Sequence, residues 1–117
     1  MTYTNYTSIN SLEEFSIIAG NDFLLEFTVY QDDGVNLLDI STATIKWVLS
    51  PFGQPSFTAL QKTGTITGVG TFSVSLLSAD TSSLSGKYIQ QPVIDSGGVI
   101  YRPAQGCIFI QPQIVVA

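Results

Sequence analysis

The stretch A-T-I-K-W-V-L-S, residues 43–50, decides the fold that we expect for this chain. Its apolar side chains Ile45, Trp47 and Leu49 alternate with polar ones, and this two-residue period is typical of a strand with one buried face. Trp47 is the only tryptophan, and we expect the strand that carries it to run through the centre of a sheet, with the indole ring against a facing sheet. This pattern predicts a β-sandwich.

The same alternation recurs on both sides of that strand. Residues 22–30 show it most clearly, and residues 70–76 repeat it. A tyrosine at the start of a later strand completes the set. The predicted core consists of Trp47, Phe23, Leu25, Phe27, Val29, Ile45, Leu49, Phe72, Val74, Leu76 and Tyr88.

Shorter strands and turns fill the rest of the chain. We expect strands at 14–19, 58–62, 64–68, 87–94, 99–102 and 106–115, with a short edge piece at 37–41. Turns are expected at 31–34 and 95–98, and Pro51 is expected to end the tryptophan strand. Residues 78–86 are polar enough for one helical turn, with Ser78 or Asp80 as its N-cap.

About seven or eight antiparallel strands in a chain of this length favour an all-β, immunoglobulin-like sandwich over a barrel. L-S-G-K-Y at 84–88 looks like a tyrosine corner, in which Tyr88 would hydrogen-bond across the preceding connection. Antibody domains have a cysteine two residues later, where Gln90 stands here. Cys107 is the only cysteine, so we expect no disulfide and a role for this thiol as a small hydrophobe.

Length and charge limit what the chain can be. With 117 residues it is expected to form one domain, at 13–117, preceded by an extended arm at 1–12. Only 11% of residues are charged, which is usual for proteins packed among neighbours, although a free monomer with a neutral polar surface fits as well. A net charge of -5 with four scattered cations argues against nucleic-acid binding. No signal peptide and no membrane span are expected.

Residues for catalysis or metal binding are scarce. The chain has no histidine, and its carboxylates lie mostly at turns, so we expect no enzyme, no cofactor and no metal site. Asp32, Asp33 and Asp39 could gather around a calcium ion, but they lack the ligand spacing of a calcium loop, and a plain turn is favoured. The glycines at 64, 68 and 70 indicate a hairpin and not a phosphate loop.

Five stretches carry a family resemblance: A-G-N-D-F-L-L-E-F at 19–27, D-D-G at 32–34, L-L-D-I-S-T-A-T-I-K-W at 37–47, S-P-F-G at 50–53 and G-T-F-S-V-S-L-L-S-A-D-T-S-S-L-S-G-K-Y at 70–88. Together they resemble the N-terminal domain of phage baseplate upper proteins and related Ig-like domains of tailed-phage virions. The resemblance implies a structural protein of the virion, made in a host cytoplasm. Because members of that family continue into further domains, a chain of this length would be a stand-alone baseplate adaptor or a capsid decoration protein.

Two functions follow as hypotheses. The first is a structural module that joins other virion proteins in many symmetric copies, with candidate contacts at Tyr3, Tyr6, Ile114, Val115 and Val116. The second is a module that binds host-surface carbohydrate through the loop aromatics Phe52, Phe57, Tyr101 and Tyr30. Glycan-binding modules usually carry several aromatics in one loop. Here we expect them to be spread over strands and separate turns, so the structural role is favoured.

Overall fold

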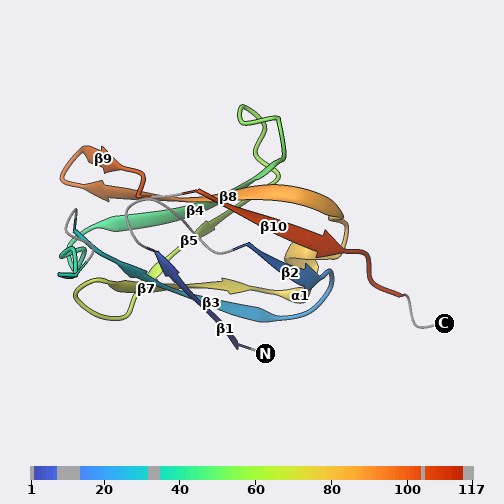
Figure 1. Ribbon diagram of the computed structural model, residues 1–117, viewed down its shortest axis with the longest axis horizontal. Coiled ribbons are helices and arrows are strands. Elements are labelled where there is room, and N and C mark those ends of the chain that lie inside the picture. Colours follow the sequence, from blue (N-terminus) through green and yellow to red (C-terminus); the bar gives the residue numbers. More distant parts are fainter. Residues whose placement is uncertain (1, 8–13, 32–34, 104, 115–117) are drawn as a thin grey trace.

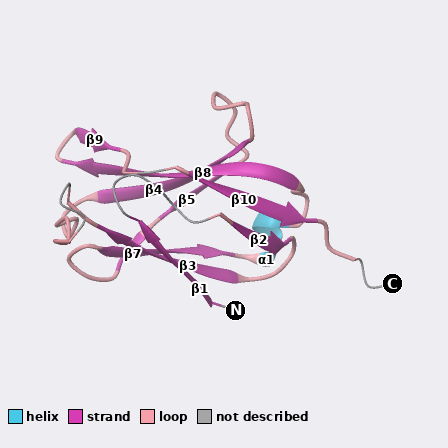
Figure 2. Cartoon of the chain, in the orientation of Figure 1, coloured by secondary structure: helices cyan, strands magenta, loops and turns pink. Residues whose placement is uncertain are grey.

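The computed structural model describes residues 2–7, 14–31, 35–103 and 105–114, and it places them in ten strands and one helical turn (Figure 1). The elements are β1 (Thr2–Thr7), β2 (Phe15–Ile18), β3 (Phe23–Val29), β4 (Thr44–Pro51), β5 (Leu60–Thr63), β6 (Thr65–Ile66), β7 (Thr71–Leu76), α1 (Ser78–Thr81), β8 (Gly86–Ser96), β9 (Val99–Tyr101) and β10 (Gly106–Gln111). Figure 2 shows how completely strands dominate.

Two sheets face each other. One has the order β1-β3-β7-β6, and the other has the order β2-β10-β8-β4-β5, with β9 added to the end of β8. The predicted all-β sandwich without a disulfide is therefore confirmed. Two strand pairs differ from the antiparallel expectation, because β1 runs parallel to β3 and β2 runs parallel to β10.

The tryptophan strand β4 lies inside the six-stranded sheet, between β8 and β5. Pro51, opposite Tyr88, is the last residue of β4, so the strand ends at this proline as expected. A second proline, Pro92, lies in the middle of β8, opposite Trp47. On its other side β8 has no ladder partner between Gln90, which pairs with β10, and Ile94, which pairs with β9. A residue without an N–H can be accommodated at such a gap.

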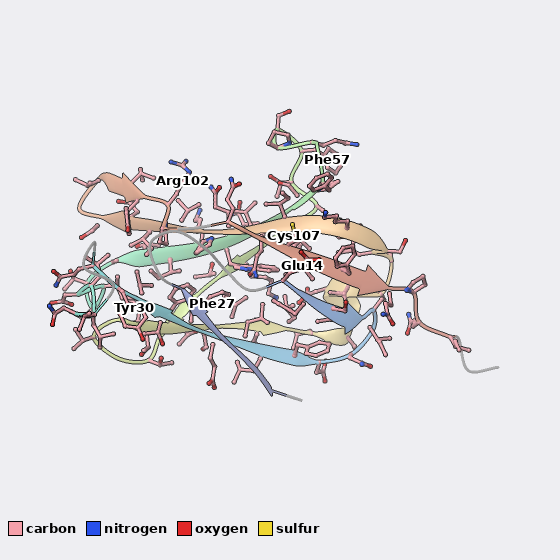
Figure 3. All side chains as sticks on the ribbon, in the orientation of Figure 1. Glu14, Phe27, Tyr30, Phe57, Arg102 and Cys107 are labelled. Carbon is pink, nitrogen blue, oxygen red and sulfur yellow. The ribbon has the colours of Figure 1, made fainter. Side chains whose placement is uncertain are left out.

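All eleven side chains of the predicted core are buried between the sheets. Figure 3 shows Phe27 between the two layers, and its ring stacks on that of its cross-strand partner Phe72 at 4.7 Å between centroids. Further core residues come from β2, β8, β10 and the connections between strands: Phe15, Ile17, Ala19, Ile40, Ile94, Ile108 and Ile110. The core therefore extends to both ends of the sandwich.

Trp47 is fully buried, and its polar atom has a specific partner. Its indole Nε1 donates a hydrogen bond of 2.9 Å to Oε1 of Gln90, which is also fully buried. Gln90 thus holds the tryptophan by a hydrogen bond within the core. The predicted tyrosine-corner bond is not found, because the Tyr88 hydroxyl has no hydrogen-bond partner among the described residues.

The helical turn α1 lies within the range that the sequence predicts, but its N-cap is Leu77 and neither Ser78 nor Asp80. Asp80, at the third helical position, accepts a hydrogen bond from the Leu77 amide at 2.8 Å. The amide of Ser78 donates to Oδ1 of Asp22, 56 residues away in sequence, at 2.7 Å. Two carboxylates therefore satisfy amides at the start of this turn, and one of them ties it to the β2–β3 connection.

At both sides of the sandwich, strands that are consecutive in the sequence belong to opposite sheets. On one side β5 pairs with β4 and β6 pairs with β7, with only Gly64 between them. A Cβ atom on Gly64 would lie 2.8 Å from a side-chain carbon of Ile45, so the crossing requires glycine. On the other side, β1 pairs with one sheet and β2 with the other. The sequence shows no two-residue alternation of apolar and polar side chains at 1–12. An edge strand such as Thr2–Thr7 can pair through its backbone without that alternation.

Candidate functional site

A groove crosses the outer face of the six-stranded sheet, the face turned away from the core. Its floor comes from alternate residues of two central strands, among them Val48, Ile89 and Val93. The connection between β4 and β5 forms one wall, and the connection between β9 and β10 forms the other. We call this feature the outer-face groove. Its volume of about 470 Å³ is within the usual range of small-ligand sites.

The groove combines apolar surface with a few polar side chains. Phe52 is its aromatic residue, Arg102 its cation, and Gln91 and Gln105 its amides. The Gln105 amide donates to Oε1 of Gln91, so the two side chains fix one another. Gln91 Nε2 and Gln105 Oε1 have no partner among the described residues, and they leave one donor and one acceptor in the groove.

Three of the four cations in the chain lie on this outer face. Lys46 stands opposite Val93 in the register, Lys87 precedes Ile89 by two residues on β8, and Arg102 lines the groove. The fourth, Lys62, is neutralised by Asp80 at 2.9 Å, the one ion pair within the described ranges. The groove itself is lined by no carboxylate.

Two carboxylates lie on the same face of the sheet. Asp95 belongs to the end of β8, where its Oδ1 accepts the Gly98 amide at 2.9 Å and so stabilises the hairpin turn. Glu14 precedes β2 and is separated from β8 by β10. The outer face is therefore locally cationic on a chain with a net charge of -5.

Lys87 also fixes the aromatic residue of the groove. Its ammonium lies 4.1 Å from the centroid of the Phe52 ring and 5.5 Å from that of Phe109. A cation over an aromatic face stabilises that arrangement, here by about 0.5–1 kcal/mol as at other exposed sites. Phe52 is 54% exposed, so this contact holds a large apolar surface in place beside the groove.

The four aromatics proposed for carbohydrate binding divide into two groups. Phe52 and Phe57 share the connection between β4 and β5, where Figure 3 shows Phe57 projecting on the same side as Arg102. Tyr30 and Tyr101 are half-buried and lie on other elements, Tyr30 in a bridge with Leu37 and Tyr101 in β9. The aromatics are therefore spread over strands and separate turns, as expected, although Phe52 and Phe57 lie in successive turns of one connection.

One end of the sandwich exposes apolar side chains. The β8–β9 hairpin, with glycines of φ 62° and 89° in its turn, presents Val99 and Ile100 there. The neighbouring loops add Val35, Leu37 and Val69, and the amide of Ile40 bonds to the carbonyl of Val69. An open hollow of about 640 Å³ lies between the hairpin and residues 38–40. We call this surface the apolar end; it belongs to the end of the sandwich that carries β9 in Figure 1.

The candidate contact residues are only partly described. Ile114 is 95% exposed in the segment after β10, which ends at Gln111 and is shorter than predicted. Val115 and Val116 lie outside the described residues, as do the side chains of Tyr3 and Tyr6. These four positions, and the division into an arm and a domain, remain predictions.

Several aspartates of the described residues bond to nearby backbone amides. Asp39 accepts the amide and the hydroxyl of Ser41, at 2.9 and 2.6 Å, and these bonds lower its pKa. Asp32 and Asp33, the other two positions of the calcium alternative, lie outside the described residues. No group of three metal-ligating side chains occurs in the part of the chain that the structure describes. Within that part, no helix is long or apolar enough to cross a membrane.

No sequence pattern indicated the outer-face groove. Gln91, Arg102 and Gln105 come from a strand and a later connection, and nothing in their spacing marks a site. The alternation of β8 does assign Ile89, Gln91 and Val93 to one face, but only the structure shows which loops stand over that face.

A comparison with known proteins identifies a solved structure with a similar fold. No protein-family model matches the sequence, and no curated protein matches it. Among solved structures, the N-terminal domain of phage TP901-1 ORF48 is similar, with a TM-score of 0.67 and 10% sequence identity. The match covers 95% of this chain and 99% of that one. The two chains therefore share a fold over nearly their whole length.

Proposed function

We propose that this chain is a non-enzymatic structural module of a tailed-phage virion, either an adaptor on the baseplate or tail or a decoration protein on the capsid surface. The observation that carries the proposal is the full-length fold match to a domain of a phage protein. The sequence resemblance to virion domains points the same way, through motifs such as L-L-D-I-S-T-A-T-I-K-W at 37–47.

The surface of the molecule supports an assembly role. The apolar end carries five large exposed side chains, one of which, Val99, lines an open hollow, and such patches mark protein contacts. The low share of charged residues fits a protein that is covered by neighbours. In this proposal many symmetric copies dock through the apolar end, and the segments at 1–12 and 112–117 add contacts with neighbouring proteins.

The first test measures whether purified phage particles contain this protein. Virions purified from a culture that produces this protein should contain it in a fixed stoichiometry to the major structural proteins, as measured by quantitative mass spectrometry. Immunogold labelling then distinguishes head from tail. Abundant protein in the lysate together with its absence from purified particles would refute the proposal.

The second test is reattachment to particles that lack the protein. We expect Val99→Thr with Ile100→Thr to weaken co-sedimentation with such particles, since both side chains lie at the apolar end. Ile18→Thr is the matched control, because Ile18 is also exposed but belongs to β2, away from the β8–β9 hairpin. Deleting residues 1–12 should likewise weaken attachment, with melting curves recorded to show that the sandwich still folds. Equal binding by all variants would exclude both surfaces.

A further inference from the structure

We propose that the outer-face groove binds an acidic oligosaccharide, a chain of sugars that carries ring carboxylates such as uronic or sialic acid. This activity is separate from the assembly role, because the groove and the apolar end are lined by different residues. The argument rests on the groove's chemical composition, its charge and its rigidity.

The lining matches a ligand with many hydroxyl groups and few charges. The amides Gln91 and Gln105 and the hydroxyls of Ser50 and Thr58 both donate and accept hydrogen bonds, as sugar hydroxyls require. Phe52 and the aliphatic floor offer apolar surface for the C–H face of a sugar ring. A polypeptide rich in acidic residues would instead require several cations in the lining, and there is one.

The single cation in the lining, Arg102, favours a ligand that carries a carboxylate. The Arg102 guanidinium has no acidic partner among the described residues, and its planar fork pairs with carboxylates through two parallel hydrogen bonds. Lys46 and Lys87 flank the groove and add attraction for an anion without lining it. A neutral sugar would form no ion pair with Arg102 and would not be attracted by the two lysines.

The groove is also organised before a ligand arrives. Lys87 fixes the ring of Phe52, and the hydrogen bond between Gln91 and Gln105 fixes two of the polar groups. The floor residues belong to the two central strands of the sheet. Binding therefore orders few side chains, which favours affinity.

The test is a titration of the full chain with small soluble probes. Binding is measured from the changes in amide chemical shifts in nitrogen–proton NMR spectra. Two pairs of probes compare an acidic sugar with a neutral one: trigalacturonate with its methyl ester, which has the same shape without the charge, and sialyllactose with lactose. Pentaglutamate is the probe for an acidic polypeptide. We expect saturable binding of at least one carboxylate sugar at about 1 mM or tighter, weakened by added salt, with shifts centred on Phe52, Gln91 and Gln105.

Variants connect the binding to the groove. Arg102→Gln should weaken binding of the acidic sugar at least tenfold, and Arg102→Lys less than that, because lysine keeps the charge but loses the fork. Lys62→Gln makes the same change in net charge away from the groove and should leave binding unchanged. Phe52→Ala should weaken binding of the acidic sugar and of any neutral sugar alike.

Three results would overturn the inference: no shift with any carboxylate sugar at saturating probe, equal affinity for trigalacturonate and its methyl ester, or tighter binding of pentaglutamate at the same residues. The last result would assign the groove to an acidic polypeptide. None of these outcomes bears on whether the protein is a component of virions, so the two proposals stand or fall separately.

Discussion

At the scale of single residues, the contact between Trp47 and Gln90 is the most specific feature of the core. Gln90 Oε1 accepts the indole N–H, while its Nε2 atom is buried without a hydrogen-bond partner among the described residues. The glutamine therefore satisfies the tryptophan and leaves one of its own groups unsatisfied. A buried polar group without a partner destabilises the fold by about 1–3 kcal/mol, so the net contribution of the pair is small.

Replacing one partner alone should have a large effect. Gln90→Met leaves the indole N–H of Trp47 buried and unpaired, and we expect it to lower the free energy of unfolding by about 1–3 kcal/mol. In a Trp47→Phe background the same substitution should be close to neutral or stabilising, because it then removes only the unpaired amide. Urea unfolding of the four proteins measures this coupling. Additive effects would show that the hydrogen bond contributes nothing.

A glycine marks a second point where single atoms decide the packing. A Cβ atom on Gly70 would lie 2.8 Å from the Leu37 side chain and 3.0 and 3.2 Å from the backbone oxygens of Leu38 and Val29. Backbone oxygens cannot move aside as a flexible side chain can, since the Gly70 carbonyl also accepts the Val29 amide at 2.8 Å. We expect Gly70→Ala to lower the melting temperature by several degrees in a thermal scan. An unchanged melting temperature would show that this loop is free to shift.

At the scale of elements, the sequence predicted most strands and missed the features that depend on distant partners. Alternation identified β3, β4 and β7, because each has one buried face and needs no information about neighbours. Edge strand β1 has no such period, and only its pairing with β3 reveals it. The N-terminus of α1 also depends on a distant partner, because Asp22 accepts a hydrogen bond from the Ser78 amide, 56 residues away in the sequence. The outer-face groove also needed the structure, since it is built from separate segments.

The helical turn α1 gives a prediction about pH. The pKa of Asp80 is lowered, first by the hydrogen bond from the Leu77 amide and then by the one from Lys62. A carboxyl with a depressed pKa stabilises the folded state above its unfolded pKa, about 3.9, and that stabilisation is lost as the pH falls through its folded pKa. Asp80→Asn should therefore lower stability by about 1 kcal/mol near neutral pH, with the difference shrinking below about pH 4.

Lys62→Gln serves as the comparison for Asp80→Asn, since it removes the ion pair but keeps the bond from Leu77 to Asp80. Its effect should be smaller, because a partly exposed pair contributes less than about 1 kcal/mol. Urea unfolding at a series of pH values measures both variants. A difference between Asp80→Asn and the parent protein that stays constant down to pH 2 would contradict this account of α1.

At the scale of the whole molecule, the last strand of the described chain is bound beside an early strand in the six-stranded sheet. β10 lies between β8 and β2, and it contributes the buried side chains Ile108 and Ile110. β2, which contributes Phe15 and Ile17 to the core, pairs only with β10 among the described strands. The sandwich is therefore completed by its last strand, whereas the segment that follows it, 112–114, is exposed.

Two truncations separate the fold from its tail. A chain that stops after Gln111 loses the exposed Ile114 and a long hydrogen bond of 3.4 Å from Gln113 to Ser82, so we expect its melting temperature to fall by only a few degrees. A chain that stops after Gln105 loses all of β10, including two buried isoleucines, each of which contributes roughly 2–5 kcal/mol. That loss exceeds the usual stability of a small domain, so the shorter chain should show no cooperative transition by circular dichroism. A cooperative transition in the shorter chain would show that β2 and β10 are accessory to the sandwich. Unfolding of the longer one would mean that residues 112–117 belong to the core, and they could then not serve as a separate contact with neighbouring virion proteins.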